Sequence, residues 1–291
     1  MGRRIACVLL ALLAAAAPAR AARRDERVPT RNMPGPVPVA VATPPSYDAT
    51  PLRRYPVLYF LHDGQGDEAV LFRQGVIDAL DAAMRAGRLP EMIIVCPRGK
   101  GTWWVDAQGG ARRMAAFLTD DLVPFVDRTF RTRPSRDGRV AAGISMGGYG
   151  ALRWALARPD LFTAAGGLSP AIQQLCVPSV AALPFFLRPS LEAVFGADPV
   201  ANVLRRNDLY QMLLDDPSLA ARAPFLLVRC GTEDKYRLAE IAGFFGRFAS
   251  AVGAAHEVRL ETGVHDWPYW RRVFPDFAAS LAARLPSGET P

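Results

Sequence analysis

The sequence has few cysteines, histidines and lysines, and these shortages exclude several classes of protein. Its 291 residues include four cysteines and three histidines. They contain no Cys-x-x-Cys motif and no Cys/His cluster with the spacing of metal ligands, so we expect no metal site. Lysine occurs only at Lys100 and Lys235, and the arginines form no block. Because nucleic-acid binding needs a clustered basic patch, we expect no nucleic-acid partner.

The sequence also lacks an apolar run long enough to span a membrane comfortably. Its first residues instead follow the pattern of an export signal. The basic residues Arg3 and Arg4 precede an apolar stretch from Ile5 to Ala17, and the small-x-small cleavage site Ala19–Ala21 follows it. A spanning helix needs about 20 apolar residues. We therefore expect residues 1–21 to be a cleaved signal peptide and the mature protein to be periplasmic or secreted, with no stable membrane span. The alternative is an uncleaved anchor.

Three cysteines would remain after cleavage: Cys96, Cys176 and Cys230. Cys96 and Cys230 lie at the ends of apolar runs, where a cysteine commonly acts as a small buried hydrophobic residue. At most one disulfide can form among the three, and the sequence does not decide whether one does.

Composition and patterning predict an α/β protein. Half of the residues are hydrophobic and 22% are charged, which is enough apolar surface for a large core. Short apolar runs alternate with helical patterns, and such alternation indicates a mostly parallel sheet with helices on both faces. The expected strands are Val39–Ala42, Val57–Leu61, Met92–Cys96, Val140–Ile144, Phe162–Leu168, Phe225–Cys230 and Glu257–Leu260. The expected helices are Val70–Ala86, Met114–Thr129, Tyr149–Ala157, Arg237–Val252 and Tyr269–Ala282.

The predicted organisation is one α/β domain over residues 39–285. Residues 22–38 are rich in arginine and proline and indicate a linker or loose arm. Residues 170–224 break the alternation with prolines and aromatic clusters, so we expect an irregular helical insertion over the sheet. The alternative is a small second domain. We expect Phe185 and Phe186 of this insertion to line the substrate pocket, although they could equally serve only to pack it.

One motif indicates a nucleophile. The strand Val140–Ile144 leads into Gly143-Ile144-Ser145-Met146-Gly147 and then into a helix. This is the G-x-S-x-G pattern in the strand–turn–helix setting that places a serine in a sharp, strained turn. Side chains two residues either side of Ser145 would clash in such a turn, which explains the glycines. We therefore predict Ser145 as a catalytic nucleophile rather than part of a plain tight turn.

A serine needs a general base because its hydroxyl is a weak nucleophile near neutral pH. In α/β-hydrolases the base follows the serine and the acid in the chain, which excludes His62. His256 begins a predicted strand, whereas His265 follows the last strand. Ligands of such sheets bind at the carboxyl ends of the strands, so we predict His265 as the base.

The acid that orients the histidine is expected after the strand Phe225–Cys230. This strand ends in Gly231-Thr232-Glu233-Asp234-Lys235. We predict Asp234, with Glu233 as the alternative. Asp266 is disfavoured because adjacent side chains on a loop usually diverge.

Two backbone N–H groups are expected to form an oxyanion hole. One belongs to Met146, directly after the nucleophile. The other belongs to Gly64 or Gln65, in the glycine-containing loop after Val57–Leu61. A metal site in the same loop would have to use His62, Asp63 and Asp67, and we do not expect one. Trp104, which follows Trp103 on another strand-end loop, is a candidate for lining the substrate pocket or for packing beneath the loop.

Four segments together resemble the esterase D family, also described as putative esterases. They are Tyr55–Gln65 (YPVLYFLHDGQ), Gly143–Leu152 (GISMGGYGAL), Gly231–Asp234 (GTED) and Gly263–Trp270 (GVHDWPYW). The family includes feruloyl esterases, enterochelin-esterase-like proteins, S-formylglutathione hydrolases and mycolyltransferases. The resemblance implies an α/β-hydrolase fold, no cofactor, and Ser145, Asp234 and His265 as a catalytic triad.

Many family members have His-Gly where this sequence has His62-Asp63, so the resemblance does not settle the subfamily. The expected activity is hydrolysis of a small-molecule or polysaccharide-linked carboxylic ester through an acyl-enzyme. The alternatives are acyl transfer to a sugar or lipid hydroxyl and a non-catalytic binding scaffold. The sequence identifies neither the acyl and alcohol groups nor the oligomeric state.

Overall fold

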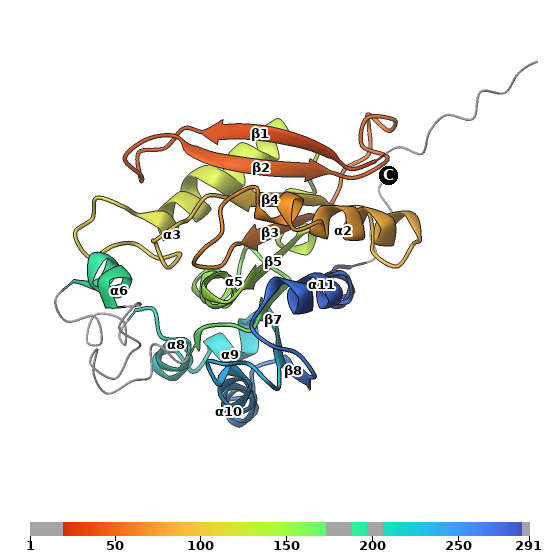
Figure 1. Ribbon diagram of the computed structural model, residues 1–291. Coiled ribbons are helices and arrows are strands. Elements are labelled where there is room, and N and C mark those ends of the chain that lie inside the picture. The colour runs from red at the N-terminus through yellow and green to blue at the C-terminus, as the bar shows by residue number, and fades with distance from the viewer. Residues whose placement is uncertain (1–19, 173–187, 197–205, 287–291) are drawn as a thin grey trace, which may run out of the picture.

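The computed structural model describes residues 20–172, 188–196 and 206–286, which form an eight-stranded sheet covered by helices on both faces (Figure 1). The strand order is β1-β2-β4-β3-β5-β6-β7-β8. The strands β4, β3, β5, β6, β7 and β8 are parallel, and β1 and β2 are antiparallel to their neighbours. Their bounds are β1 Ala22–Val28, β2 Val37–Thr43, β3 Val57–Leu61, β4 Ile93–Pro97, β5 Arg139–Ile144, β6 Ala164–Leu168, β7 Phe225–Gly231 and β8 His256–Glu261. This confirms the predicted α/β class and all seven predicted strands to within two residues at each end.

The prediction that residues 22–38 form a linker is wrong at both ends, since residues 37 and 38 already belong to β2. Residues 22–28 form the edge strand β1, which pairs with β2 along its whole length, from Ala22 opposite Thr43 to Val28 opposite Val37. Most β1 side chains are exposed and charged, so the segment has no hydrophobic alternation to reveal it. Its backbone hydrogen bonds to β2 hold it in place, and charged side chains are typical of edge strands because they discourage further pairing.

Two apolar cores lie on opposite faces of the sheet. Along β3, Val57, Tyr59 and Leu61 belong to one core and Leu58 and Phe60 to the other, as expected for a strand buried on both sides. The first core is shared with α5 and α10, and the second with α2 and α11. The helices are α1 Val70–Arg73, α2 Val76–Arg85, α3 Met114–Ala116, α4 Val123–Thr129, α5 Met146–Ala157, α6 Arg188–Phe195, α8 Leu209–Asp215, α9 Leu219–Arg222, α10 Leu238–Ala251 and α11 Trp267–Ala282.

The helices differ from the predictions where the backbone changes conformation locally. The helix expected over Val70–Ala86 divides into α1 and α2 because Gly75 adopts φ 68°, which a helix interior does not allow. The helix expected over Met114–Thr129 contains a π-helical stretch, Phe117–Leu122, between α3 and α4. The buried apolar residues of α1 and α2 pack together in the second core, and those of α3, the π-helical stretch and α4 pack in the first.

The predicted insertion contains α6, α8 and α9, which the sequence patterns did not resolve individually. Phe185, Phe186 and Cys176 lie outside the described residues, so the expected pocket role of the two phenylalanines stays a prediction. Phe195, at the end of α6, is buried. No helix in the described ranges has the length and apolar character needed to cross a membrane.

Candidate active site

Ser145 lies in a strained turn between β5 and α5. Its backbone has φ 54° and ψ −116°, in the region that favours glycine. The turn needs glycine on both sides: a Cβ on Gly143 would lie 2.1 Å from the Gly147 carbonyl oxygen, and one on Gly147 would lie 1.9 Å from the Leu61 carbonyl oxygen. The first turn of α5 thus lies too close to the end of β5 for a side chain at position 143 and too close to the end of β3 for one at position 147, which explains the glycine spacing on which the prediction rested.

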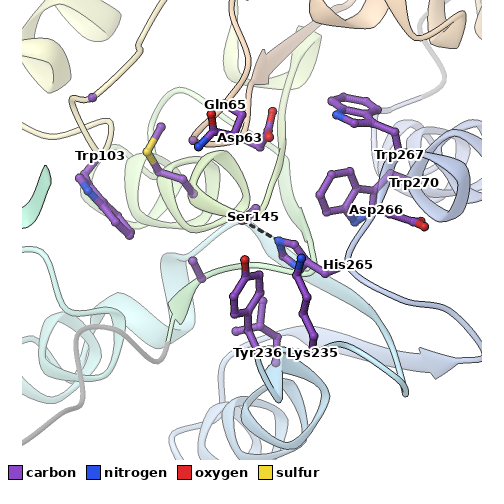
Figure 2. A pocket seen from close by; sticks show the side chains of 15 residues that line it. Asp63, Gln65, Trp103, Ser145, Lys235, Tyr236, His265, Asp266, Trp267 and Trp270 are labelled. Carbon is purple, nitrogen blue, oxygen red and sulfur yellow. Dashed lines mark hydrogen bonds between the residues drawn. The ribbon is translucent and has the colours of Figure 1, made fainter. Parts of the chain in front are cut away.

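Three side chains from the carboxyl ends of β5, β7 and β8 form a hydrogen-bonded chain. His265 Nε2 lies 3.0 Å from Ser145 Oγ (Figure 2). On the other side of the ring, His265 Nδ1 lies 2.6 Å from Asp234 Oδ2. The Asp234 side chain is fully buried and that of His265 is 8% exposed. Asp234 also accepts a hydrogen bond from the Tyr236 backbone N–H, which fixes its carboxylate. A carboxylate at Nδ1 holds the imidazole in the tautomer that leaves Nε2 free to accept the serine proton.

The alternative residues take no part in this hydrogen-bonded chain. Glu233 is exposed. His256 hydrogen-bonds through Nδ1 to the Ala254 carbonyl oxygen at the start of β8, the opposite end of that strand from His265. Asp266 caps α11, since its Oδ1 accepts from the Tyr269 N–H.

Two aromatic rings enclose the His265 imidazole. Tyr236 and Trp270 contact it edge to face, with ring centroids 4.9 Å and 4.8 Å away. The Trp270 indole N–H donates to Ser169 Oγ at 3.2 Å. Ser169 is fully buried directly after β6 and has φ 44°. Sequence reasoning missed Ser169 and Trp270, although the position of Ser169 at the end of a strand beside β5 could have singled it out.

Cys230 lies behind Asp234. Its Sγ is 3.8 Å from both Asp234 Oδ2 and Ser169 Oγ. Burial, followed by the nearby Asp234 carboxylate, raises the pKa of this thiol to about 12, so it stays a neutral S–H group. Cys96 is likewise a buried free thiol, and burial raises its pKa. Both cysteines therefore behave as the sequence predicted.

Ser145 and His265 open onto a cavity of about 470 Å³ (Figure 2). Met146, Gly64 and Gln65, the predicted oxyanion-hole residues, line the same cavity. Met146 is the first residue of α5, where backbone N–H groups have no acceptor within the helix. The other lining residues are Asp63, Gly101, Trp103, Ala171, Lys235, Tyr236, Leu238, Asp266, Trp267 and Trp270.

The pocket role expected for Trp104 is wrong by one residue. Trp103 lines the cavity, whereas Trp104 is fully buried beneath the loop. The Trp104 indole N–H donates to the His62 carbonyl oxygen at 3.2 Å, and its ring fills the space that a Cβ on Gly99 or Gly150 would need. Both tryptophans have positive φ angles, so their side-chain directions could not be inferred from the sequence.

His62 supports the loop that holds Gly64 and Gln65. Its Nε2 accepts from the Gly99 N–H at 2.9 Å, and its Nδ1 lies 2.7 Å from the Asp63 carbonyl oxygen, to which it donates. Burial lowers the pKa of His62, so the ring is neutral and both nitrogens are engaged. Within the described ranges, no three His, Cys, Asp or Glu side chains form a group that could hold a metal ion.

The mostly parallel sheet and the strained Ser145 turn define the chain as an α/β-hydrolase. A ferulic acid esterase structure superposes with a TM-score of 0.78, at 22% identity over 92% of this chain and 99% of that one. The Mycobacterium tuberculosis protein MPT51 superposes with a TM-score of 0.69, at 20% identity over 91% and 99% of the two chains. At these identities the likeness shows the fold.

The family model described as "Putative esterase" matches residues 30–281, and the chain belongs to this esterase family. Esterase Rv1288 of Mycobacterium tuberculosis is 37% identical over 120 residues, which are 40% of this chain and 25% of that protein. The chain thus matches only a quarter of that relative's length. An acetyl esterase of Caldicellulosiruptor saccharolyticus is 25% identical over 191 residues, covering 62% of this chain and 67% of that protein.

Proposed function

We propose that the protein is an exported serine carboxylic-ester hydrolase in which Ser145, His265 and Asp234 form the catalytic triad. The observation that supports this most strongly is the hydrogen-bonded chain from Ser145 Oγ through His265 to the buried Asp234 carboxylate. Membership of the esterase family supports the reaction class.

In the proposed mechanism His265 Nε2 takes the Ser145 proton as Oγ attacks the ester carbonyl carbon. The resulting oxyanion is stabilised by the Met146 N–H and by an N–H of Gly64 or Gln65. The imidazolium then gives its proton to the leaving alcohol, which departs and leaves the acyl group on Ser145. A water molecule, deprotonated by His265, releases the acid and restores the free serine. Asp234 stabilises the positive charge on His265 in both steps.

Export is the second part of the proposal and rests on residues 1–21. The expected cleavage site lies directly before Ala22, where β1 begins. Removing the leader there would keep every strand of the sheet. Secretion of a tagged full-length chain, with an N-terminal sequence beginning at Ala22, would support export; retention of the whole chain in the cytoplasm would contradict it.

A fluorophosphonate probe tests whether Ser145 is the activated nucleophile. Such probes react with serines that a neighbouring base activates. We expect one adduct per chain, located at Ser145 by peptide mass spectrometry and absent in Ser145→Ala. An unlabelled, well-folded wild-type protein would indicate a binding scaffold. Product analysis with added glycerol separates hydrolysis from acyl transfer: we expect the free acid to predominate over glycerol esters.

A further inference from the structure

The two edges of the sheet differ in how strongly their side chains discourage pairing with another strand. β1 ends the sheet on one side and β8 on the other (Figure 1). The exposed side chains of β1 are all charged. In β8, by contrast, Leu260 is 47% exposed, and Val264, in the loop that follows, is 39% exposed. An edge strand with exposed apolar side chains is a ready site for pairing with another chain.

The main chain of β8 offers hydrogen-bonding groups for such pairing. On the inner side of the strand, the Ala255 carbonyl oxygen accepts from the Leu226 N–H at 2.9 Å, and the parallel ladder with β7 continues from there in register. Successive residues of a strand direct their backbone groups to opposite sides, so the odd-numbered residues of β8 bond to β7. The residues whose N–H and C=O groups point away from the sheet are His256, Val258 and Leu260.

The charges of β8 are complementary to those of a second, antiparallel copy of the strand. A two-fold axis between two such copies must pass through a residue, because outward-facing groups have to meet outward-facing groups. With the axis at Val258, Glu257 of each copy lies opposite Arg259 of the other. With the axis at Glu257 or Arg259, like charges meet directly. An axis at Leu260 opposes Arg259 to Glu261 but leaves the first part of the strand unpaired.

The side chains of β8 lie where this register needs them. Glu257 and Arg259 form an ion pair along the strand, and Arg259 also donates to Ser280 Oγ of α11 at 3.3 Å. Both charges therefore lie on the α11 face of the sheet, where they can meet the opposite charges of a second copy. Val258 packs into the first core, on the face that α10 covers. β1 has no equivalent register, because residues 23–27 are all charged and an axis at any of them opposes that charge to itself.

We propose that the protein forms a homodimer in which β8 pairs antiparallel with β8 of a second copy, with the two-fold axis at Val258. The pairing joins the two eight-stranded sheets into one continuous sheet. It sets Leu260 of each copy beside His256 of the other, on the α10 face. Because both copies use the same edge, the association closes at two chains, and the charged β1 strands remain as the outer edges.

Charge exchange tests the proposed register. For a chain that begins at Ala22, which keeps every strand of the sheet, sedimentation analysis should show the mass rising from one chain to two with concentration. Arg259→Glu and Glu257→Arg each place two pairs of like charges at the interface, so each should raise the dimer Kd by about tenfold or more. The double variant Glu257→Arg/Arg259→Glu restores both pairs with their signs exchanged, and its Kd should return to within about threefold of the wild-type value.

Arg158→Glu is the matched control. Arg158 pairs with Asp160 two residues away, as Arg259 pairs with Glu257, but it lies at the end of α5, which packs on β5 and β6. This substitution should leave the Kd unchanged. Hydrogen exchange gives a second measurement: the outward Val258 N–H should exchange more slowly as the dimer forms.

Three results would overturn the proposal. The first is a wild type that stays monomeric up to about 1 mM. The second is a dimer whose Kd does not respond to either single charge reversal, which would mean that another surface holds it together. The third is a double variant that dimerises no better than the single variants, because the two strands would then not be paired about Val258.

Discussion

Trp270 holds His265 from the side opposite Tyr236: the two ring planes of Trp270 and His265 meet at 82° with centroids 4.8 Å apart. Because its indole N–H is tied to Ser169, which lies between the carboxyl ends of β5 and β7, Trp270 links the histidine loop to the centre of the sheet. Trp270 thus acts as a positioning residue for the base, and its contribution can be separated from that of substrate binding.

Trp270→Phe should lower kcat by about tenfold with little change in KM. Phenylalanine keeps most of the ring packing but loses the hydrogen bond to Ser169, so His265 gains freedom to leave the position 3.0 Å from Ser145 Oγ. Small misplacements of a catalytic group lower turnover strongly. Ser169→Ala removes the same hydrogen bond from the other partner and should reproduce the kcat effect. A fall in kcat/KM caused wholly by a higher KM would show that Trp270 serves substrate binding instead.

Asp234→Asn should lower kcat by about three to four orders of magnitude, because an amide favours the wrong histidine tautomer and does not stabilise the imidazolium. Glu233→Gln is the matched control: its side chain is exposed and adjacent in sequence, and it should change kcat by less than about twofold. With p-nitrophenyl acetate as substrate, a larger fall in kcat for Glu233→Gln than for Asp234→Asn would mean that the acid has been assigned to the wrong residue.

Gly147→Ala should prevent folding or lower the free energy of unfolding by more than about 3 kcal/mol. The added Cβ would overlap the Leu61 carbonyl oxygen, where α5 packs tightly against the end of β3. Gly109→Ala has no atom within 4 Å of the added Cβ and should leave the thermal unfolding midpoint within about 1 °C of the wild type. Equal midpoints for the two variants would contradict the close approach of β3 and α5.

Cys230 should resist thiol reagents in the folded protein. Raising its pKa from 9.0 to about 12 lowers the reactive thiolate fraction at pH 8 by about a thousandfold, and burial blocks access as well. In a chain that begins at Ala22 and carries Cys176→Ser, Ellman's reagent should report no fast-reacting thiol before denaturation and full reaction of Cys96 and Cys230 after it. Rapid labelling of Cys230 in the native protein would place it in a more open environment.

The sequence predicted the parts of the molecule that depend on local patterns. Such parts are the continuous apolar runs of β3 and β5 and the G-x-S-x-G turn. Together they predicted the edge of the sheet at which Ser145 and His265 lie. β1 was missed because its stability comes from backbone pairing rather than from a hydrophobic face. The cavity is lined by Trp103 rather than by the predicted Trp104. The sequence could not reveal this because positive φ angles at both residues redirect their side chains. The Ser169–Trp270 contact joins residues 101 positions apart, and no local pattern encodes it.

The turnover of p-nitrophenyl acetate by Ser145→Ala tests the central claim most directly. Alanine removes the nucleophilic oxygen while leaving the strained turn and its neighbours in place, and loss of a triad nucleophile lowers kcat by about a millionfold. We predict that the purified variant keeps the wild-type thermal unfolding midpoint to within a few degrees and shows no turnover above the uncatalysed background. A folded Ser145→Ala protein that retains a tenth of the wild-type kcat would contradict the assignment of Ser145 as the nucleophile.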